Sequence, residues 1–174
     1  STVNVVGGSD NYIINNTFSG ENCDAFIKLI DTSLGHVISN NMTFNNVKTL
    51  IIIKNSKDSE IAYNILVGMA NYVVNSIDSS YTKFNHNNLT ISGYSIFGYY
   101  GDNSAFDSIL YNDINIIGMA KTTNQAAIYF TGNSASNTVA HNNIFSYSVN
   151  GDDYAVIIIA NENLFNKVIN NYLI

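Results

Sequence analysis

Four tyrosine and histidine residues at near-regular spacing are the first candidates for chemistry in this chain. They alternate as Tyr63, His86, Tyr111 and His141. If their side chains point outward, they form a polar aromatic ladder that suits sugar rings through ring stacking and hydroxyl contacts. The alternative is an exterior stack that only stiffens a sheet, which is a common role for cross-strand pairs. We therefore weigh a ligand-binding face against a structural stack at these residues.

Three aspartates form a second candidate group. Asp113 lies two residues after Tyr111, and Asp152 and Asp153 lie together in a later repeat. Hydrolysis of a sugar needs two carboxyl groups roughly 5–10 Å apart, and the same oxygens could bind Ca²⁺ weakly. Paired acids at a loop tip are more often solvated turn residues. No histidine or cysteine spacing resembles a transition-metal site, so we expect no cofactor beyond weak Ca²⁺ binding.

A recurring asparagine positions these candidates along the chain. An apolar residue precedes it by three positions and another follows it by two, as in Val37, Asn40 and Met42. The seven anchor asparagines are Asn16, Asn40, Asn64, Asn87, Asn112, Asn142 and Asn171. Their spacings are 24, 24, 23, 25, 30 and 29 residues. A repeat of about 20–50 residues with fixed chemistry in fixed columns indicates a solenoid.

Each repeat has room for three short strands. Asp or Asn followed by Ser or Thr stands nine and eight residues before most anchors, as in Asp31-Thr32, and suits a tight bend. Short strands flank the anchor, and a β-branched and aromatic run follows, without helical periodicity. These runs are 25–30, 49–53, 72–77, 94–100, 126–130 and 154–160. We predict one all-β domain over 1–174, a right-handed parallel β-helix of about seven coils.

We interpret the seven asparagines as a structural ladder rather than a ligand site. Asn tolerates the left-handed backbone of a sharp bend, and stacked amides can hydrogen-bond along a column. The column two before the anchor is largely apolar, and adjacent strand residues cannot both face inward. We expect the Tyr/His column outside, with strain or a bulge at the bend. The opposite arrangement would leave an apolar stripe outside, suited to packing against another chain.

Composition excludes some partners. The chain has 174 residues, is 46% hydrophobic but only 11% charged, and carries a net charge of −6. Lysines supply all seven basic residues, so there is no arginine and no clustered basic surface for nucleic acid. The single cysteine, Cys23, cannot form an internal disulfide. The last two spacings hold extra residues at 118–125 and 147–153, which are either binding loops or tolerated insertions.

Two segments carry a family resemblance. Residues 59–66 (SEIAYNIL) and 137–145 (NTVAHNNIF) resemble the repeat of pectate-lyase-like right-handed parallel β-helices. The Asn-, Ile- and Tyr-rich style with little charge resembles that of archaeal adhesin-like surface proteins. The resemblance covers essentially the whole chain and implies an extracellular or cell-surface location. It does not settle activity, because the superfamily includes lyases, hydrolases, tailspikes, adhesins and passive scaffolds.

The enzymatic branches of this superfamily fit the sequence poorly. The resemblance to pectate lyases implies an arginine base, which this chain lacks. Polygalacturonases use several aspartates, then Gly-His-Gly, then Arg-Ile-Lys. Here the nearest fragments, 35–37 (GHV) and 151–153 (GDD), stand in reverse order, and no Arg-Ile-Lys exists.

We therefore favour a non-enzymatic adhesin-like spacer that presents faces and loops to a glycan or a surface protein. A polysaccharide lyase or glycoside hydrolase is one alternative. A self-assembling filament or sheath subunit is the other. The sequence stops in mid-coil at 172–174. We expect either a longer chain or end-to-end or lateral association, because open coils are normally capped.

Overall fold

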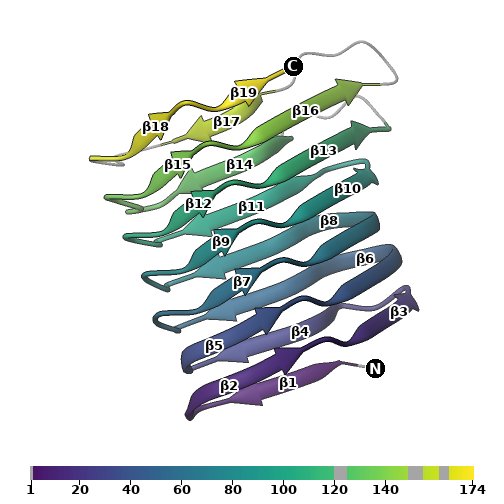
Figure 1. The fold of residues 1–174 in the computed structure, drawn as a ribbon, viewed down its shortest axis with the longest axis vertical. Helices are drawn as coiled ribbons and strands as arrows, with labels where there is room; N and C mark the ends of the chain where they lie inside the picture. Colours follow the sequence, from purple (N-terminus) through teal and green to yellow (C-terminus); the bar gives the residue numbers. More distant parts are fainter. Residues whose placement is uncertain (1, 120–124, 149–154, 161–164) are drawn as a thin grey trace.

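The computed structural model describes residues 2–119, 125–148, 155–160 and 165–174, and these residues form β-strands joined by tight bends (Figure 1). The strands pair in parallel throughout the described part. Within these ranges there is no helix, and hence none long and apolar enough to cross a membrane. The expected all-β parallel solenoid is confirmed.

The strands fall into three files along the solenoid. The first file precedes the anchors and contains β2 (Ser9–Ile14), β5 (Ser33–Ile38), β7 (Glu60–Ala62), β9 (Lys83–Asn85), β12 (Ser108–Leu110), β15 (Thr138–Ala140) and β18 (Lys167–Ile169). The second follows the anchors and contains β3 (Thr17–Glu21), β10 (Asn88–Gly93), β13 (Asp113–Gly118), β16 (Asn143–Ser148) and β19 (Tyr172–Leu173). The third contains β1 (Val3–Val6), β4 (Ala25–Ile30), β11 (Phe97–Asp102), β14 (Ala126–Thr131) and β17 (Ala155–Ile159).

Two long strands join the second and third files. They are β6 (Asn41–Lys54) and β8 (Ile65–Ile77), whose pairing shifts register between Phe44 and Val47. Three separate strands per coil were expected, and in these coils the bend between the last two is smooth enough for one strand to run through it. The run predicted over 94–100 begins as a strand only at Phe97.

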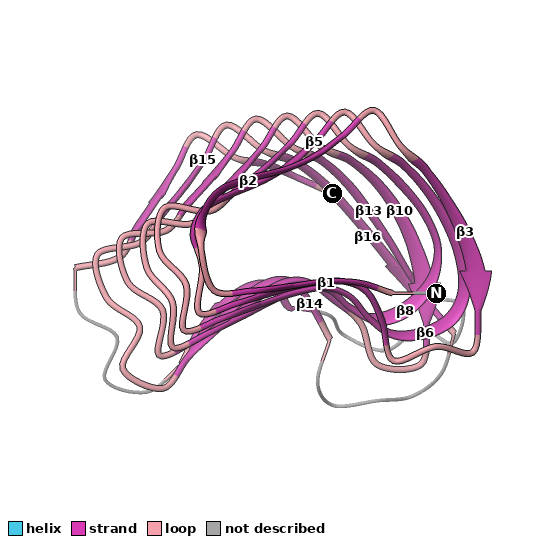
Figure 2. Cartoon of the chain, turned by 90° about the horizontal axis from the view of Figure 1, so that it is seen from below, coloured by secondary structure: helices cyan, strands magenta, loops and turns pink. Residues whose placement is uncertain are grey.

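The coil is right-handed. In Figure 1 the front strands run from left to right and the fainter rear strands return, while the chain rises from the N- to the C-terminus. Figure 2, viewed along the solenoid axis, shows the same front strands on one side of the lumen and β1 and β14 on the other. Residues 2–119 make about five turns without a break. This count differs slightly from the seven coils expected.

Apolar side chains of all three files fill the lumen. The columns three before and two after the anchor are buried in the inner coils, as at Ile61, Leu66, Phe84 and Leu89. The third file adds a further row that includes Val74. Burying one such side chain contributes about 1.5–3 kcal/mol, and parallel stacking makes the core continuous from coil to coil.

The anchor asparagines form a hydrogen-bonded ladder at the corner between the first and second files. The Oδ1 of Asn87 accepts from the backbone N–H of Asn64 at 3.0 Å and from its Nδ2 at 2.9 Å. The Nδ2 of Asn87 donates to the carbonyl of Ile61 and to Oδ1 of Asn112. The pattern recurs at successive anchors. Each inner anchor is 1% exposed, so the ladder satisfies amides that water cannot reach.

Two further polar columns line the lumen. Eight residues before the anchors, Ser and Thr hydroxyls accept backbone N–H groups of the preceding coil, as Ser56 Oγ does from Thr32. Five before the anchors, Asn137 Oδ1 accepts the N–H of Asp107, and Asp107 Oδ1 accepts the N–H of Thr82, both at 2.8 Å. Buried bends thereby keep their backbone donors paired.

The residue before each anchor, and not the anchor itself, has the left-handed backbone conformation. No anchor has a positive φ, whereas the residue before each one does, with values of 50–57°. The idea that Asn is used at the anchor for its tolerance of this region is therefore wrong. The anchor's amide must point into the lumen to bond its neighbours, so the preceding residue turns the corner. The bends predicted nine residues before the anchors are confirmed, with positive φ at Gly7, Asp31, Asn55, Asp78 and Asn103.

The ladder predicts a large cost for removing one amide. Asn87→Ala leaves the N–H and one Nδ2 hydrogen of Asn64 buried without partners, and it removes a side-chain donor from the carbonyl of Ile61. At about 1–3 kcal/mol for each unpaired group, the free energy of unfolding should fall by at least about 2 kcal/mol in urea denaturation. Asn41→Ala, on the exposed first residue of β6, is the matched control and should cost under about 0.5 kcal/mol. Equal losses in both variants would contradict the ladder's role.

Candidate functional site

The Tyr/His column lies on the outside of the anchor corner. Tyr63 and Tyr111 are 57% and 52% exposed, and His86 and His141 are also exposed. The strain expected at this bend takes the form of left-handed backbone at all four residues, with φ of 53–56°. The residues two before the anchors, which are largely apolar, differ in burial: Ala62 is buried, and others are about half exposed.

The four rings stack on one another along the solenoid axis. Their centroids are 4.9 Å apart for Tyr63–His86, 5.2 Å for His86–Tyr111 and 5.1 Å for Tyr111–His141, and interplanar angles do not exceed 23°. Stacking covers the inner ring faces, so the column offers mainly ring edges, hydroxyls and imidazole nitrogens. The ring stacking with a sugar that the sequence suggested therefore has no free face inside this column. Hydrogen bonding along its edge remains available.

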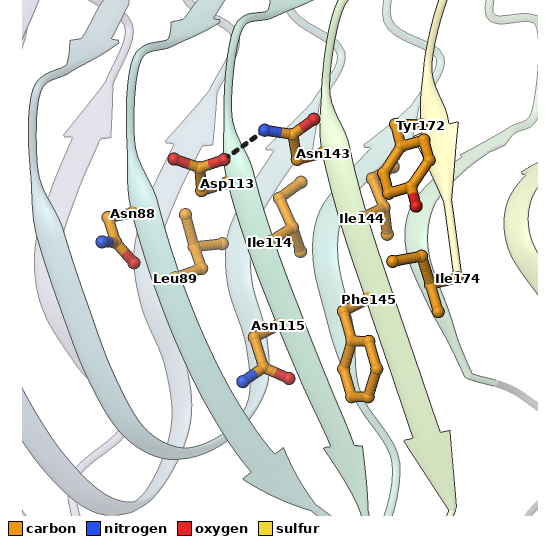
Figure 3. A pocket seen from close by; sticks show the side chains of 10 residues that line it. All are labelled: Asn88, Leu89, Asp113, Ile114, Asn115, Asn143, Ile144, Phe145, Tyr172 and Ile174. Atoms are coloured by element: carbon orange, nitrogen blue, oxygen red, sulfur yellow. Dashed lines mark hydrogen bonds between the residues drawn. The ribbon is translucent and has the colours of Figure 1, made fainter.

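Asp113 lies on the other side of the same corner, at the start of β13. It belongs to an outward row across β10, β13, β16 and β19 whose members pair in register: Asn88, Asp113, Asn143 and Tyr172. Asn143 Nδ2 donates to Asp113 Oδ1 at 2.8 Å. The row forms one wall of a shallow pocket of about 420 Å³, and Asn115, Phe145 and Ile174 form the other wall (Figure 3). We call this pocket the furrow.

The structure brings some of the predicted residues together and leaves others apart. Tyr111 and Asp113 flank the buried anchor Asn112 and share one corner of the coil. Asp152 and Asp153 lie outside the described residues, as does most of the segment 147–153. The described residues contain no group of three His, Cys, Asp or Glu side chains placed to hold a metal ion. Asp113 is the only acid among the residues that line the furrow.

A buried acid elsewhere, Asp107, has a strongly raised pKa. Asp107 is 1% exposed, and burial raises its pKa from 3.8 to about 7, although hydrogen bonds from Thr82 and Tyr99 oppose that rise. The hydroxyl of Tyr99 donates to Asp107 Oδ2 at 2.8 Å, and burial likewise raises the pKa of Tyr99. Perturbed acids often mark active sites. This one is sealed in the lumen, so it acts as a member of a polar column rather than on a substrate.

Sequence reasoning missed the furrow and the Asp107–Tyr99 pair. Positions one and three after the anchor point outward by strand alternation, which could have identified Asn88, Asn115, Asn143 and Phe145 as neighbours of Asp113. The positions five before the anchors contain Asn, Gly, Ser, Thr and Asp. Because their residue types vary, the sequence does not show that they form one column.

The chain matches no protein-family model, no curated protein and no solved structure. The architecture that the pectate-lyase-like resemblance implied is present as a parallel β-solenoid. No match supports the resemblance to the pectate-lyase-like superfamily or to archaeal adhesin-like proteins.

Because Asp107 is buried with a raised pKa, we expect the free energy of unfolding to depend on pH. The folded protein holds this proton up to about pH 7, whereas an unfolded chain releases it near pH 4. The unfolded state therefore binds fewer protons in that window. Stability is lost as pH rises from about 4 to about 7, at about 1.4 kcal/mol per unit of pKa difference, and this group causes no further loss above that range. Asp107→Asn should remove this loss, because an amide does not titrate. The column accepts an amide, since Asn137 and Asn166 occupy equivalent positions in the following coils.

The measurement is the melting temperature from pH 4 to pH 9. Asp107→Asn should melt higher than the unmodified protein at pH 8, and the difference should vanish towards pH 4. Asp58→Asn, an exposed acid on a left-handed bend, is the control and should follow the unmodified protein. A lower melting temperature for Asp107→Asn at pH 8 would contradict the assignment.

Proposed function

We propose that this chain is a non-enzymatic β-solenoid segment of an extracellular or cell-surface protein. It serves as a stiff spacer that presents one lateral face to a glycan or to another surface protein. The face is the anchor corner, with the stacked column Tyr63, His86, Tyr111 and His141 on one side and the furrow on the other. The observation that carries the proposal is the continuous exposure of this aromatic and amide-rich corner over several coils.

The interior supports a role as a spacer. Three polar columns and a continuous apolar core tie each coil to the next. In a solenoid each coil contacts only its neighbours, so stiffness depends on such nearest-neighbour bonds. Most of the chain's hydrogen bonding is thus directed along the axis, as a rod requires.

The distribution of acids supports recognition over turnover. Glycoside hydrolysis needs two carboxyl groups that converge on one bond. In the described part, Asp113 faces outward beside amides, while Asp107 faces the lumen and bonds to Tyr99. Neither of these two acids is hydrogen-bonded beside a second carboxyl group, and Asp152 and Asp153 lie outside the described residues.

The test combines binding with turnover. The chain should release no reducing ends or unsaturated products from a polysaccharide panel, and it should bind to a subset of a glycan array or to whole cells. His86→Asn/Tyr111→Asn should weaken that binding at least about tenfold, a change of about 1.4 kcal/mol. Asn is the matched replacement because Asn15 and Asn170 occupy the same left-handed column.

A second aromatic pair supplies the control. Tyr81 and Phe106 stack at 4.9 Å on a different bend of the same coils. Tyr81→Asn should leave binding within about twofold of the unmodified protein, with Asp10 and Asp58 as the precedent for a small polar residue in that column. Catalytic turnover, or binding equally insensitive to both variants, would refute the proposed face.

A further inference from the structure

The furrow differs from the Tyr/His column in the availability of its ring faces. Phe145 and Tyr172 are 43% and 64% exposed, and neither ring makes a contact with another ring of the described residues. Figure 3 shows the two rings on opposite walls of the furrow. A sugar packs the apolar face of its ring against an aromatic face. The furrow, not the stacked column, therefore meets this requirement.

The polar groups of the furrow are planar amides, one carboxylate and the hydroxyl of Tyr172. Asn88, Asp113 and Asn143 lie side by side in register along one wall. Asp113 uses Oδ1 to accept from Asn143, and a carboxylate has acceptor capacity for further donors. On the other wall, Asn115 adds a further side-chain amide. Such groups suit the hydroxyls of a polyol, which donate and accept at closely spaced points.

Charge restricts the class of sugar. The furrow contains one acid and no lysine, and the chain has no arginine and a net charge of −6. An acidic sugar would bring its carboxylate near Asp113 without a cation to neutralise either, and like charges held close in a partly desolvated site repel. Polyuronates, sulfated glycans and sialylated glycans are therefore disfavoured. The volume of about 420 Å³ lies within the usual range for small-ligand sites, about 300–1,000 Å³.

We propose that the furrow binds neutral sugar units. A pyranose ring packs on Phe145 or Tyr172, its hydroxyls donate to Asp113, and the amides of Asn88 and Asn143 hold the neighbouring oxygens. This inference rests on the proposed function and deepens it, because it assigns both a place and a ligand class to the lateral face.

The experiment measures affinity by calorimetry for neutral oligosaccharides (glucose, mannose, galactose and N-acetylglucosamine series) and for glucuronic and galacturonic acid oligomers. At least one neutral series should bind, and the uronic acid series should bind at least about tenfold more weakly. Phe145→Ala and Asp113→Ala should each lower affinity for the neutral sugar at least about tenfold. Asp113→Asn should narrow the difference between neutral and acidic sugars, because it removes the repelling charge and keeps an acceptor.

The control is Tyr94→Ala, an equally exposed tyrosine on a bend outside the furrow, which should leave affinity within about twofold. All substituted side chains are exposed, so unchanged melting temperatures will show that the fold is intact.

The possible results separate the two proposals. If His86→Asn/Tyr111→Asn abolishes glycan binding while Phe145→Ala and Asp113→Ala do not, the furrow assignment is wrong and the lateral face stands. If uronic acids bind as tightly as neutral sugars, the charge argument fails. If no glycan binds but a cell-surface protein does, the sugar site is refuted and the spacer role is kept. Absence of binding to any glycan, protein or cell refutes both.

Discussion

Each corner of this solenoid buries polar groups that water cannot reach, and the neighbouring coil provides their partners. At the anchor corner the partner of a buried amide is the same amide one coil away, with both its lone pairs and both its hydrogens used. An unpaired buried group costs about 1–3 kcal/mol, so a change in one coil affects two others. This requirement explains why Asn recurs when almost every other polar position varies. It also fixes the axial register of all three strand files.

The same corner determines what appears on the outside. Because the anchor's amide points inward, the preceding residue must turn the chain through the left-handed region, which costs a non-glycine residue about 1–2 kcal/mol. That residue's side chain then points outward beside its equivalents in adjacent coils. Where it is Tyr or His, the rings lie 4.9–5.2 Å apart and stack, which contributes about 0.5–1.5 kcal/mol per pair. The exposed aromatic column thus partly offsets the strain that the buried ladder imposes.

The sequence predicts the parts of the molecule that repeat with uniform chemistry. The apolar columns around the anchors and the bends before them predict the parallel solenoid. The alternation of side chains along a strand predicts that Tyr63 and Tyr111 face outward. The furrow lies between two outward columns of the same strands, and strand alternation could have placed its residues together. The Asp107–Tyr99 hydrogen bond joins residues of two different columns, and no repeat in the sequence indicates such a contact. The role of the anchor is also ambiguous in the sequence, because Asn suits both a left-handed bend and a buried amide ladder. In the fold the anchor has no positive φ and forms the ladder.

Parallel stacking also limits the chemistry that a surface of this kind can perform. Outward side chains stand in rows about 4.8 Å apart, so a row of amides and hydroxyls meets a polymer at repeated, shallow points of contact. Turnover needs a different arrangement, with two acids at one point and their pKa values driven apart. Here the acid with the raised pKa, Asp107, is enclosed in the lumen, and the acid at the furrow, Asp113, has Asn88 and Asn143 as its row neighbours. The architecture that fixes the rows so firmly therefore favours recognition of a repeating ligand over its cleavage in the described part of the chain.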